Sequence, residues 1–363
     1  MSARRPLYFL IAGEASGDQL GADLMRDLKV QHHGKIDFIG IGGVKMAEEG
    51  LKKSLFPMEE LSIIGIFGIL AKLRSLLRRL KETIMTIEKV QPDVVITIDA
   101  PEFSFRVAKA IRKKRVGKKP KLIHYVAPTV WALLPGRAQK IARIYDELFC
   151  LYPFEPPYFE KHGLKTNFVG HPLARDPEGN ARRFYEKSGI PEGTPLLILL
   201  PGSRKSEVTG LLPLFMKASD QFLQANPTWR VVIPTVPYVE NLVRETTQTW
   251  SANPYIFMGD EMRRDAFAAS RVALAASGTV ALELGLSGIP FAIAYQVSAV
   301  TAFIIRRIMK THYACMVNIL FGSEIIPELL QEKCTVENMV NFLENAGDRT
   351  PERAKTLRKM LTS

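Results

Sequence analysis

The sequence lacks the marks of several large protein classes. Its three cysteines, Cys150, Cys315 and Cys334, are widely spaced and form no CxxC pair, which argues against a disulfide or zinc framework and favours reduced thiols. It contains no GxxxxGK[ST] phosphate loop and no HExxH or DxD motif, so we expect neither a P-loop nor a bound metal. The longest strongly apolar run, Leu61 to Leu70, is about half of the ~20 residues that a membrane-spanning helix needs. We therefore expect no segment that crosses a membrane.

The composition is that of a globular protein with excess positive charge. A length of 363 residues exceeds what one hydrophobic core usually organises, and 47% hydrophobic residues can supply two cores. The net charge of +12 favours an acidic partner, which can be nucleic acid, anionic lipid or a phosphorylated substrate. Charge alone does not choose among these three.

Short β-rich runs alternate with helix-length segments in both halves of the chain, and this βαβ rhythm predicts an α/β fold with parallel sheets. A stretch rich in Pro, Gly and charge, from Gly170 to Gly193, separates the halves. We therefore expect two Rossmann-like domains, residues 1–170 and 171–363, facing across a cleft, with the last helices packed on the first domain or on a partner subunit. The expected strands are Leu7–Ala12, Asp37–Ile41, Val94–Ile98, Leu122–Val126 and Leu148–Leu151, then Leu196–Leu200, Val231–Pro234, Tyr255–Phe257, Val272–Ala275 and Phe291–Ala294.

Two strands of the second half end in loops of small residues that open helices. Gly202, Ser203 and Arg204 follow one strand, and Ser277, Gly278 and Thr279 follow another. Free amides at a helix start attract phosphate, glycine permits close approach, and a guanidinium adds a charge-assisted contact. One such loop is more often ordinary turn chemistry, but two at one sheet edge favour a nucleotide site. Glu283 lies in the first turns of the second helix, where it either accepts ribose hydroxyls or complements the positive helix end.

Acidic residues follow the strands of the first half. Glu14 and Asp18 belong to the loop Gly13-Glu14-Ala15-Ser16-Gly17-Asp18, which departs from the GxGxxG spacing, and Asp99 ends another strand next to Pro101. A carboxylate at the carboxyl edge of a sheet is placed to take a proton from a substrate hydroxyl. Capping of the following helix is the alternative for Asp18 and Asp99. Trp131, at the end of the stretch His124–Trp131, either binds sugar or lipid or packs in the core.

Apolar residues step by three and four from Ile66 to Ile87, which predicts one apolar helix face. Arg74, Arg78 and Lys81 form a basic stripe elsewhere on this helix, either as a solvated side or as a surface that lies on anionic lipid. Residues 106–121 hold nine Lys or Arg and no acid, and each such charge near an anionic leaflet contributes ~1 kcal/mol. No nucleic-acid-binding motif accompanies them, so nucleic-acid binding is the distant alternative.

Six motifs of the chain occur in the order typical of lipid A disaccharide synthases, and the chain resembles that family over nearly its whole length. They are Gly13–Asp18, Ile98–Phe103, His124–Trp131, Gly170–Pro172, Leu199–Arg204 and Ser277–Glu283, and Asn318–Leu320 and Glu328–Glu332 extend the match. The chain departs from the family pattern at Ala15, Thr129 and Leu133, where relatives commonly have Thr, Ser and Trp. These departures bear on acyl-chain preference more than on chemistry.

The resemblance implies a GT-B fold and an inverting glycosyl transfer without a cofactor. UDP-2,3-diacylglucosamine would donate its sugar to 2,3-diacylglucosamine 1-phosphate, which gives UDP and a β-1,6-linked disaccharide phosphate in lipid A biosynthesis. The family is peripheral on the inner face of the cytoplasmic membrane, and a homodimer is left open. Nearby alternatives are another GT-B enzyme that uses a UDP-sugar, such as the N-acetylglucosaminyltransferase of a lipid-linked muropeptide, or a UDP-sugar epimerase.

From these loops and the implied reaction we predict roles for individual residues. Asp99 would be the general base, with Glu14 and Asp18 in reserve as the base or for acceptor orientation. The donor UDP would contact Gly202, Ser203, Arg204, Ser277, Gly278, Thr279, Glu283 and Asn318. The acceptor and the membrane would contact Ser16, Trp131, Arg74, Arg78 and Lys81.

Overall fold

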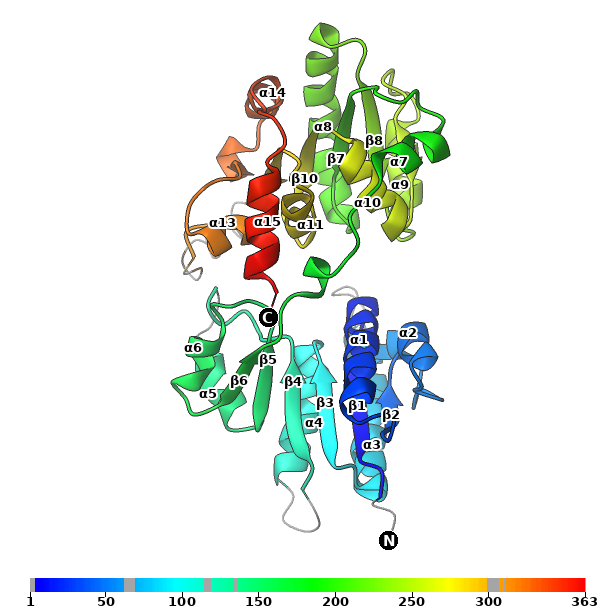
Figure 1. The fold of residues 1–363 in the computed structure, drawn as a ribbon, viewed down its shortest axis with the longest axis vertical. Helices are drawn as coiled ribbons and strands as arrows, with labels where there is room; N and C mark the ends of the chain where they lie inside the picture. The colour runs from blue at the N-terminus through cyan, green and yellow to red at the C-terminus, as the bar shows by residue number, and fades with distance from the viewer. Residues whose placement is uncertain are drawn as a thin grey trace. The chain divides into compact units, whose positions relative to one another are not determined.

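The computed structural model describes residues 4–61, 69–113, 119–132, 136–298, 307, 309 and 311–362. The chain divides into two compact units, residues up to Gly170 and residues from His171 to Thr362 (Figure 1). Part of the basic run at 106–121, and Leu133, lie outside the described residues.

The first unit is built on a parallel sheet of six strands in the order β2-β1-β3-β4-β5-β6. Its central strands are rich in apolar residues and are buried along most of their length, as expected of a parallel sheet with helices on both faces. The strands are β1 (Leu7–Ala12), β2 (Asp37–Ile41), β3 (Val94–Ile98), β4 (Lys121–Tyr125), β5 (Glu147–Cys150) and β6 (Lys165–Phe168). The helices are α1 (Ala15–Gln31), α2 (Val44–Glu48), η1 (Met58–Leu61), α3 (Ile69–Val90), α4 (Pro101–Lys113), α5 (Gly136–Ala142) and α6 (Pro156–Glu160).

The second unit repeats this architecture with a parallel sheet in the order β12-β11-β10-β7-β8-β9. The strands are β7 (Leu196–Leu200), β8 (Arg230–Pro234), β9 (Tyr255–Phe257), β10 (Val272–Ala276), β11 (Phe291–Tyr295) and β12 (Glu328–Leu330). The helices are η3 (Pro172–Ala174), α7 (Ala181–Ser188), α8 (Lys205–Ala225), α9 (Glu240–Thr247), α10 (Asp260–Ala269), α11 (Val280–Ser287), α13 (Met316–Phe321), η4 (Gln331–Lys333), α14 (Val336–Glu344) and α15 (Pro351–Met360).

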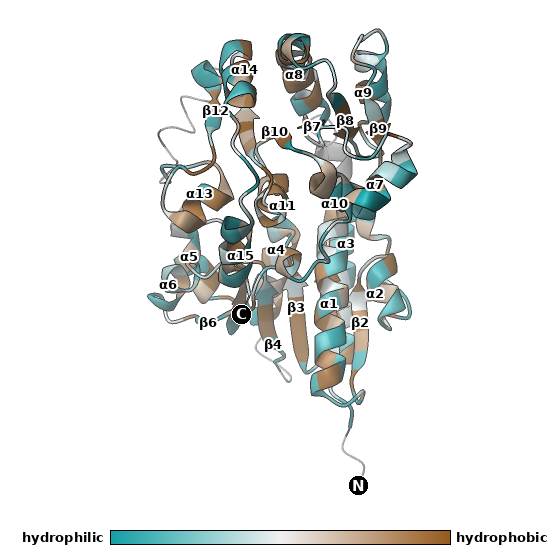
Figure 2. Ribbon diagram, turned by 45° about the horizontal axis from the view of Figure 1, so that its top comes forward, coloured by the Kyte–Doolittle hydropathy of each residue, from teal (hydrophilic) through white to brown (hydrophobic). Residues whose placement is uncertain are grey.

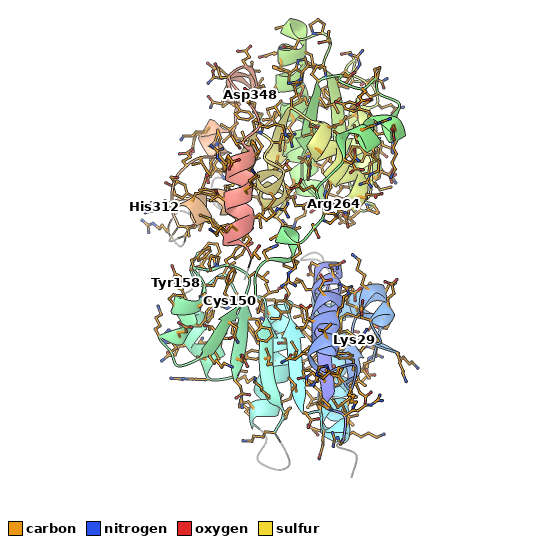
Figure 3. The ribbon with its side chains drawn as sticks, in the orientation of Figure 1. Lys29, Cys150, Tyr158, Arg264, His312 and Asp348 are labelled. Atoms are coloured by element: carbon orange, nitrogen blue, oxygen red, sulfur yellow. The ribbon has the colours of Figure 1, made fainter. Side chains whose placement is uncertain are left out.

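All the strands expected from the sequence are present, with shifts of one residue at some ends. The structure adds β6 and β12 at the sheet edges. Hydrophobic residues concentrate on the strands, and hydrophilic residues on the outer sides of the helices (Figure 2). Side chains fill the space between these layers, and Cys150 at the end of β5 is buried and free, as are Cys315 and Cys334 (Figure 3). The expected α/β fold is confirmed.

The last helix, α15, packs on α11 within the second unit. Arg358 Nη1 donates to the carbonyl oxygen of Ala174 at 2.6 Å, and the amide of His171 donates to the carbonyl oxygen of Leu361 at 2.8 Å. The end of the chain is therefore tied to the start of its own unit.

Each sheet has one point where the strand order reverses. In the first unit the chain proceeds from β1 to one side and from β3 to the other, so the reversal lies between β1 and β3. In the second unit it lies between β7 and β10. Ligands of open α/β sheets bind beyond the carboxyl ends of the strands at such points. The loops singled out from the sequence are those that follow these four strands.

Candidate active site

A pocket of about 250 Å³ lies at the reversal point of the second sheet, between the loops that follow β7, β8 and β10. It brings together seven of the eight residues assigned to the donor. Its lining includes Gly202, Ser203, Arg204, Ser277, Gly278, Thr279 and Glu283. These residues are far apart in sequence, and the parallel sheet places them at one edge because β7 and β10 are neighbours.

The amides at the start of α8 already bind a carboxylate of the chain itself. Glu207 Oε2 accepts the N–H groups of Ser203 and Arg204 at 3.1 and 3.3 Å, and Arg204 Nη1 donates to Glu207 Oε1 at 2.7 Å. Gly202 has a φ of 110°, and a Cβ there would lie 2.4 Å from Glu207 Oε2. A Cβ would also lie 2.6 Å from the Cβ of Glu207, so the positive φ and the Glu207 side chain together favour glycine here. The sequence signal for this contact is a Glu three residues after the helix N-cap, which is the glutamate half of a capping box.

Glu283 lines the same pocket and is held by an arginine that the sequence analysis did not single out. Arg263 Nε and Nη2 both lie 3.0 Å from Glu283 Oε2. Burial raises the pKa of Glu283, and the guanidinium of Arg263 opposes this rise. Thr235 also lines the pocket, and its Oγ1 is buried without a hydrogen-bond partner in the described part of the chain.

Asn318 does not line this pocket. Its side chain is fully buried, and Nδ2 donates to the carbonyl oxygen of Ile326 at 2.8 Å and to Glu328 Oε1 at 2.9 Å. Its Oδ1 accepts the N–H groups of Ile325 and Ile326 at 3.0 and 2.9 Å. Two donated and two accepted bonds use the whole capacity of the amide, so these contacts give Asn318 a structural role in the loop before β12 in place of the donor contact expected from the sequence.

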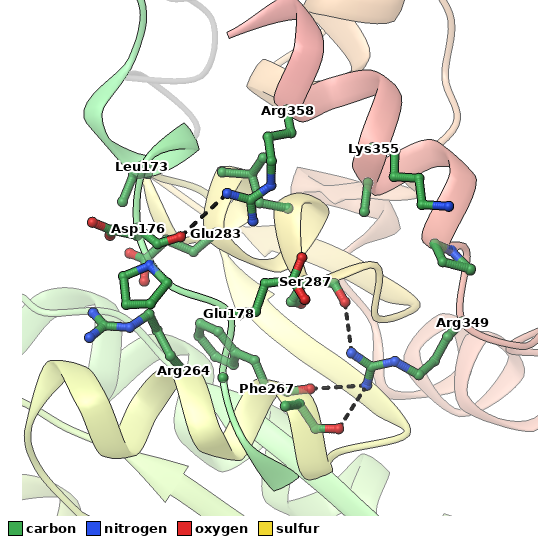
Figure 4. A pocket seen from close by; sticks show the side chains of 16 residues that line it. Leu173, Asp176, Glu178, Arg264, Phe267, Glu283, Ser287, Arg349, Lys355 and Arg358 are labelled. Atoms are coloured by element: carbon green, nitrogen blue, oxygen red, sulfur yellow. Dashed lines mark hydrogen bonds between the residues drawn. The ribbon is translucent and has the colours of Figure 1, made fainter. Parts of the chain in front are cut away.

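A second pocket of about 310 Å³ in this unit lies between α10, α11, α15 and the segment after η3 (Figure 4). Arg349 beside it donates to the carbonyl oxygens of Phe267, Ser270 and Ser287, which fixes the α15 side of the pocket. Glu283 lines this pocket as well as the first, so its side chain stands between them.

At the carboxyl edge of the first sheet, Asp99 follows β3 in a strained backbone. Asp99 and Ala100 have φ values of 50° and 45°, a region that non-glycine residues rarely adopt. The amide of Asp99 donates to the carbonyl oxygen of Tyr125 at 3.0 Å, and Ser104 Oγ donates to the carbonyl oxygen of Asp99 at 2.7 Å. Burial raises the pKa of the Asp99 carboxyl, and the Ala100 amide opposes this rise. A carboxyl with a raised pKa on a strained turn has the features of a general base.

The loop after β1 packs against this turn. A Cβ at Gly13 would lie 2.6 Å from the Ala100 Cβ, so the glycine makes room for the strained turn. Glu14 is exposed at the N-cap of α1, and Ser16 is exposed in its first turn.

Asp18 is buried, and its carboxylate binds three backbone amides. Oδ1 accepts the N–H groups of Gly43 at 2.7 Å and Met46 at 3.1 Å, and Oδ2 accepts that of Lys45 at 3.0 Å. Asp18 therefore caps the start of α2, and not the start of α1, the helix in which it lies. Its lone pairs are largely used by these bonds, which favours Asp99 over Asp18 as a base.

Trp131 is packed in the core rather than exposed to a ligand. Its side chain is 7% exposed, and Nε1 donates to Glu155 Oε1 at 3.3 Å. The ring of Phe154 makes an edge contact with it at a centroid distance of 5.2 Å. Burial raises the pKa of Glu155 to about 7. The packing interpretation of Trp131 is the one that these contacts support.

The basic stripe of α3 is exposed at Arg74, Arg78 and Lys81. Leu77, expected on the apolar face, is 49% exposed among these cations, and Met85 is 57% exposed. The expected apolar face is wrong at Leu77: from Arg74 to Val90, the part of this helix whose side chains are described, the buried residues are Leu76, Thr83 and Ile87. The predicted positions Ile66, Leu70 and Leu73 lie outside the described side chains.

The described residues contain neither a metal-binding cluster nor a membrane-spanning helix. Among the described residues, no group of three or more His, Cys, Asp or Glu side chains is placed to hold a metal ion. Within the same residues, no helix has both the length and the apolar character that crossing a bilayer requires.

The fold resembles that of several solved structures. A UDP-GlcNAc 2-epimerase from Neisseria meningitidis bound to UDP-GlcNAc has a TM-score of 0.60 at 12% identity, covering 98% of this chain and 94% of that one. MurG of Acinetobacter baumannii has a TM-score of 0.56 at 12% identity, with 98% and 96% covered. At these identities the likeness shows the fold alone, which is GT-B.

Sequence comparison identifies the family. The family model "Lipid-A-disaccharide synthetase" matches residues 8–359. The lipid-A-disaccharide synthase of Rhodospirillum centenum is 48% identical over 335 residues, which cover 92% of this chain and 83% of the relative. That of Gluconobacter oxydans is 42% identical over 335 residues, with 92% and 79% covered. The resemblance drawn from the motifs is confirmed: the chain belongs to the lipid-A-disaccharide synthase family and is a GT-B glycosyltransferase of lipid A biosynthesis.

Proposed function

We propose that this enzyme transfers 2,3-diacylglucosamine from UDP to 2,3-diacylglucosamine 1-phosphate with inversion at the donor's anomeric carbon. The products are UDP and a β-1,6-linked disaccharide 1-phosphate. The observation that carries the proposal is the pocket of the second unit, which joins two helix-start loops and Glu283 in a chain of this family. The solved epimerase of the same fold is bound to UDP-GlcNAc, which agrees with a UDP-sugar donor here.

In the proposed donor complex, the diphosphate displaces Glu207 and lies against the starts of α8 and α11, at Ser203, Gly278 and Thr279, and against Arg204. Helix-start amides and a guanidinium stabilise negative charge without a metal. Glu283 accepts hydrogen bonds from the ribose hydroxyls. These groups lie around one pocket, as this arrangement requires.

In the proposed reaction, the acceptor 6-hydroxyl oxygen attacks the anomeric carbon of the donor sugar. The bond between that carbon and the β-phosphate oxygen breaks, and its electron pair leaves with UDP. Asp99 takes the proton of the hydroxyl, and Glu14 is the reserve base or orients the acceptor. Arg204 and the helix starts stabilise the charge that develops on the leaving diphosphate, the kind of contact that contributes most to many enzymatic rates.

We place the first unit on the inner face of the cytoplasmic membrane through α3. Its exposed cations Arg74, Arg78 and Lys81 alternate with the exposed apolar side chains Leu77 and Met85. Such a surface combines attraction to anionic lipid with insertion of apolar groups at the headgroup level. Acylated substrates that reside in the bilayer are reached from this position.

The test is mass spectrometry of the products formed from UDP-2,3-diacylglucosamine, with and without 2,3-diacylglucosamine 1-phosphate. We expect the disaccharide phosphate and an equal amount of UDP only when the acceptor is present. Turnover of the UDP-sugar without an acceptor would identify an epimerase instead. Transfer from UDP-N-acetylglucosamine to a lipid-linked muropeptide, with no lipid A product, would identify the other transferase.

A further inference from the structure

Arg263 is fixed at both ends of its guanidinium. Its Nε and Nη2 lie 3.0 Å from Glu283 Oε2, and its Nη1 lies 3.0 Å from Asp260 Oδ1 on the same helix, α10. The side chain is 25% exposed, and that of Glu283 is 15% exposed. A guanidinium held by two carboxylates has little freedom to turn, so its geometry is determined before any ligand arrives.

The arginine engages only one of the two oxygens of Glu283. Within the described residues, Glu283 Oε1 accepts no side-chain or backbone hydrogen bond. A carboxylate has about four lone-pair positions, so the second oxygen keeps its full capacity as an acceptor. Because Glu283 lines both the donor pocket and the neighbouring pocket, a ligand in the donor pocket is one candidate partner for this oxygen.

The charge state of Glu283 depends on its surroundings. Burial raises its pKa, and the nearby carboxylates of Asp260 and Asp176 raise it further, whereas Arg263 lowers it. A buried carboxylate without a cation would tend to take up a proton, and its protonated oxygen is a poorer acceptor. The other charged residues that line the two pockets around Glu283 are Arg204, Glu207, Glu178, Arg264, Arg349, Lys355 and Arg358.

We propose that Arg263 is a positioning residue for donor recognition: it keeps Glu283 charged and directs Oε1 toward the ribose hydroxyls of the nucleotide. The inference rests on the proposed function, because it takes Glu283 as the ribose contact. Arg263 also lines the donor pocket, so the rival interpretation is that its cation binds the diphosphate directly. The two interpretations differ in whether the effect of Arg263 passes through Glu283.

The test is a double-mutant cycle with UDP as the ligand, measured by calorimetry across the acid and neutral pH range. We expect Arg263→Gln to weaken UDP binding about tenfold at neutral pH, the loss expected when one charge-assisted hydrogen bond to the ribose is weakened, and to move the acid loss of affinity to higher pH. Arg263→Lys should restore most of the affinity. In a Glu283→Gln background, Arg263→Gln should cause no further loss, since no carboxylate remains to be held.

Four outcomes would overturn the inference. An equal loss in both backgrounds would mean that Arg263 contacts the phosphates directly. A pH-independent loss with a lowered melting temperature would mean that Arg263 supports only the fold. Carbon-13 NMR of the Glu283 carboxyl, without ligand, gives an independent reading: an unchanged pKa in Arg263→Gln contradicts the proposal. A wild-type chain that does not bind UDP would overturn the proposed donor and with it the ribose role, and is recognised because the wild type itself fails.

Discussion

The two units of this enzyme share an architecture but not the chemistry at their sheet edges. Each has six parallel strands with one reversal point, and in each the notable loops follow the two strands that flank that point. The carboxyl edge of the first sheet, where its strands end, carries acids. One of them is Asp99, whose backbone has a positive φ, as does that of Ala100. The edge of the second unit carries helix starts and the cations Arg204 and Arg263. A common sheet therefore fixes where chemistry occurs, whereas the loop residues determine which chemistry it is.

A glycine also has a different structural function at each of these two edges. Gly13 makes room for Ala100, so it supports the strained turn that presents Asp99. Gly202 makes room for the Glu207 carboxylate, so it supports an anion already bound to the start of α8. In our proposal, the first edge accepts a proton and the second holds negative charge.

The comparison predicts its largest effect at Asp99. Asp99→Asn should lower kcat by ~10² to 10⁴, because the base is lost, and should leave the affinity for UDP unchanged, because the second unit is untouched. Since burial raises the pKa of Asp99, the wild-type rate should rise with pH through a value above that of an ordinary Asp, and the variant should lack this rise. Rate profiles and calorimetry check this, and a folded, fully active variant would remove Asp99 from the role.

The next largest effect concerns membrane binding, which we assign to the first unit alone. Changing Arg74, Arg78 and Lys81 to Gln should weaken binding to anionic vesicles at low salt by about 10², since each cation contributes ~1 kcal/mol. A control with an equal loss of charge changes the exposed Arg182, Lys187 and Lys217 of the second unit. Co-sedimentation measures both. Equal losses in the two variants would show that net charge, and not the α3 surface, governs binding.

A smaller effect distinguishes the structural role of Asp18 from the catalytic role proposed for Asp99. Asp18→Asn leaves backbone amides at the start of α2 without a carboxylate, which should cost roughly 1–3 kcal/mol of unfolding free energy. The rate per folded molecule should stay near that of the wild type. Denaturant unfolding and steady-state kinetics test this together. Retained stability with a rate as low as that of Asp99→Asn would make Asp18 the base.

Patterns local in sequence predicted the fold well, and contacts between distant residues explain what they missed. The buried strands were predictable from their apolar runs, but β6 (KTNF) and β12 (ELL) are short, polar in part and stabilised by their neighbours. The loops around the donor pocket were predictable because each follows a buried strand. The surroundings of Asn318 and Trp131 were not, since their partners Glu328 and Glu155 are brought to them only by folding.

Arg263 and Glu207 illustrate two different reasons for missing a site residue. Arg263 meets Glu283 twenty residues away through the packing of α10 beside α11, and no local pattern marks this contact. Glu207, in contrast, stands at the capping-box position, a local signal. The glycine and arginine of the same loop were interpreted for an external phosphate, although an internal carboxylate satisfies the same amides.

The smallest predicted effect is a change in UDP affinity when Glu207, at the carboxyl edge of the second sheet, is replaced. The carboxylate of Glu207 and a diphosphate cannot both bind the amides of Ser203 and Arg204, so a donor that uses this helix start must displace Glu207. Glu207→Gln keeps one acceptor for the loop but removes the charge, so UDP should bind about threefold to tenfold more tightly. Arg204→Ala should shift affinity the other way, because it removes the cation. A matched control is Glu240→Gln, which alters the Glu240–Arg244 pair at the start of α9. Calorimetry at low salt decides the matter: weaker binding of UDP by Glu207→Gln, with the control unchanged, would mean that Glu207 holds the loop permanently and that the diphosphate rests on the start of α11 alone.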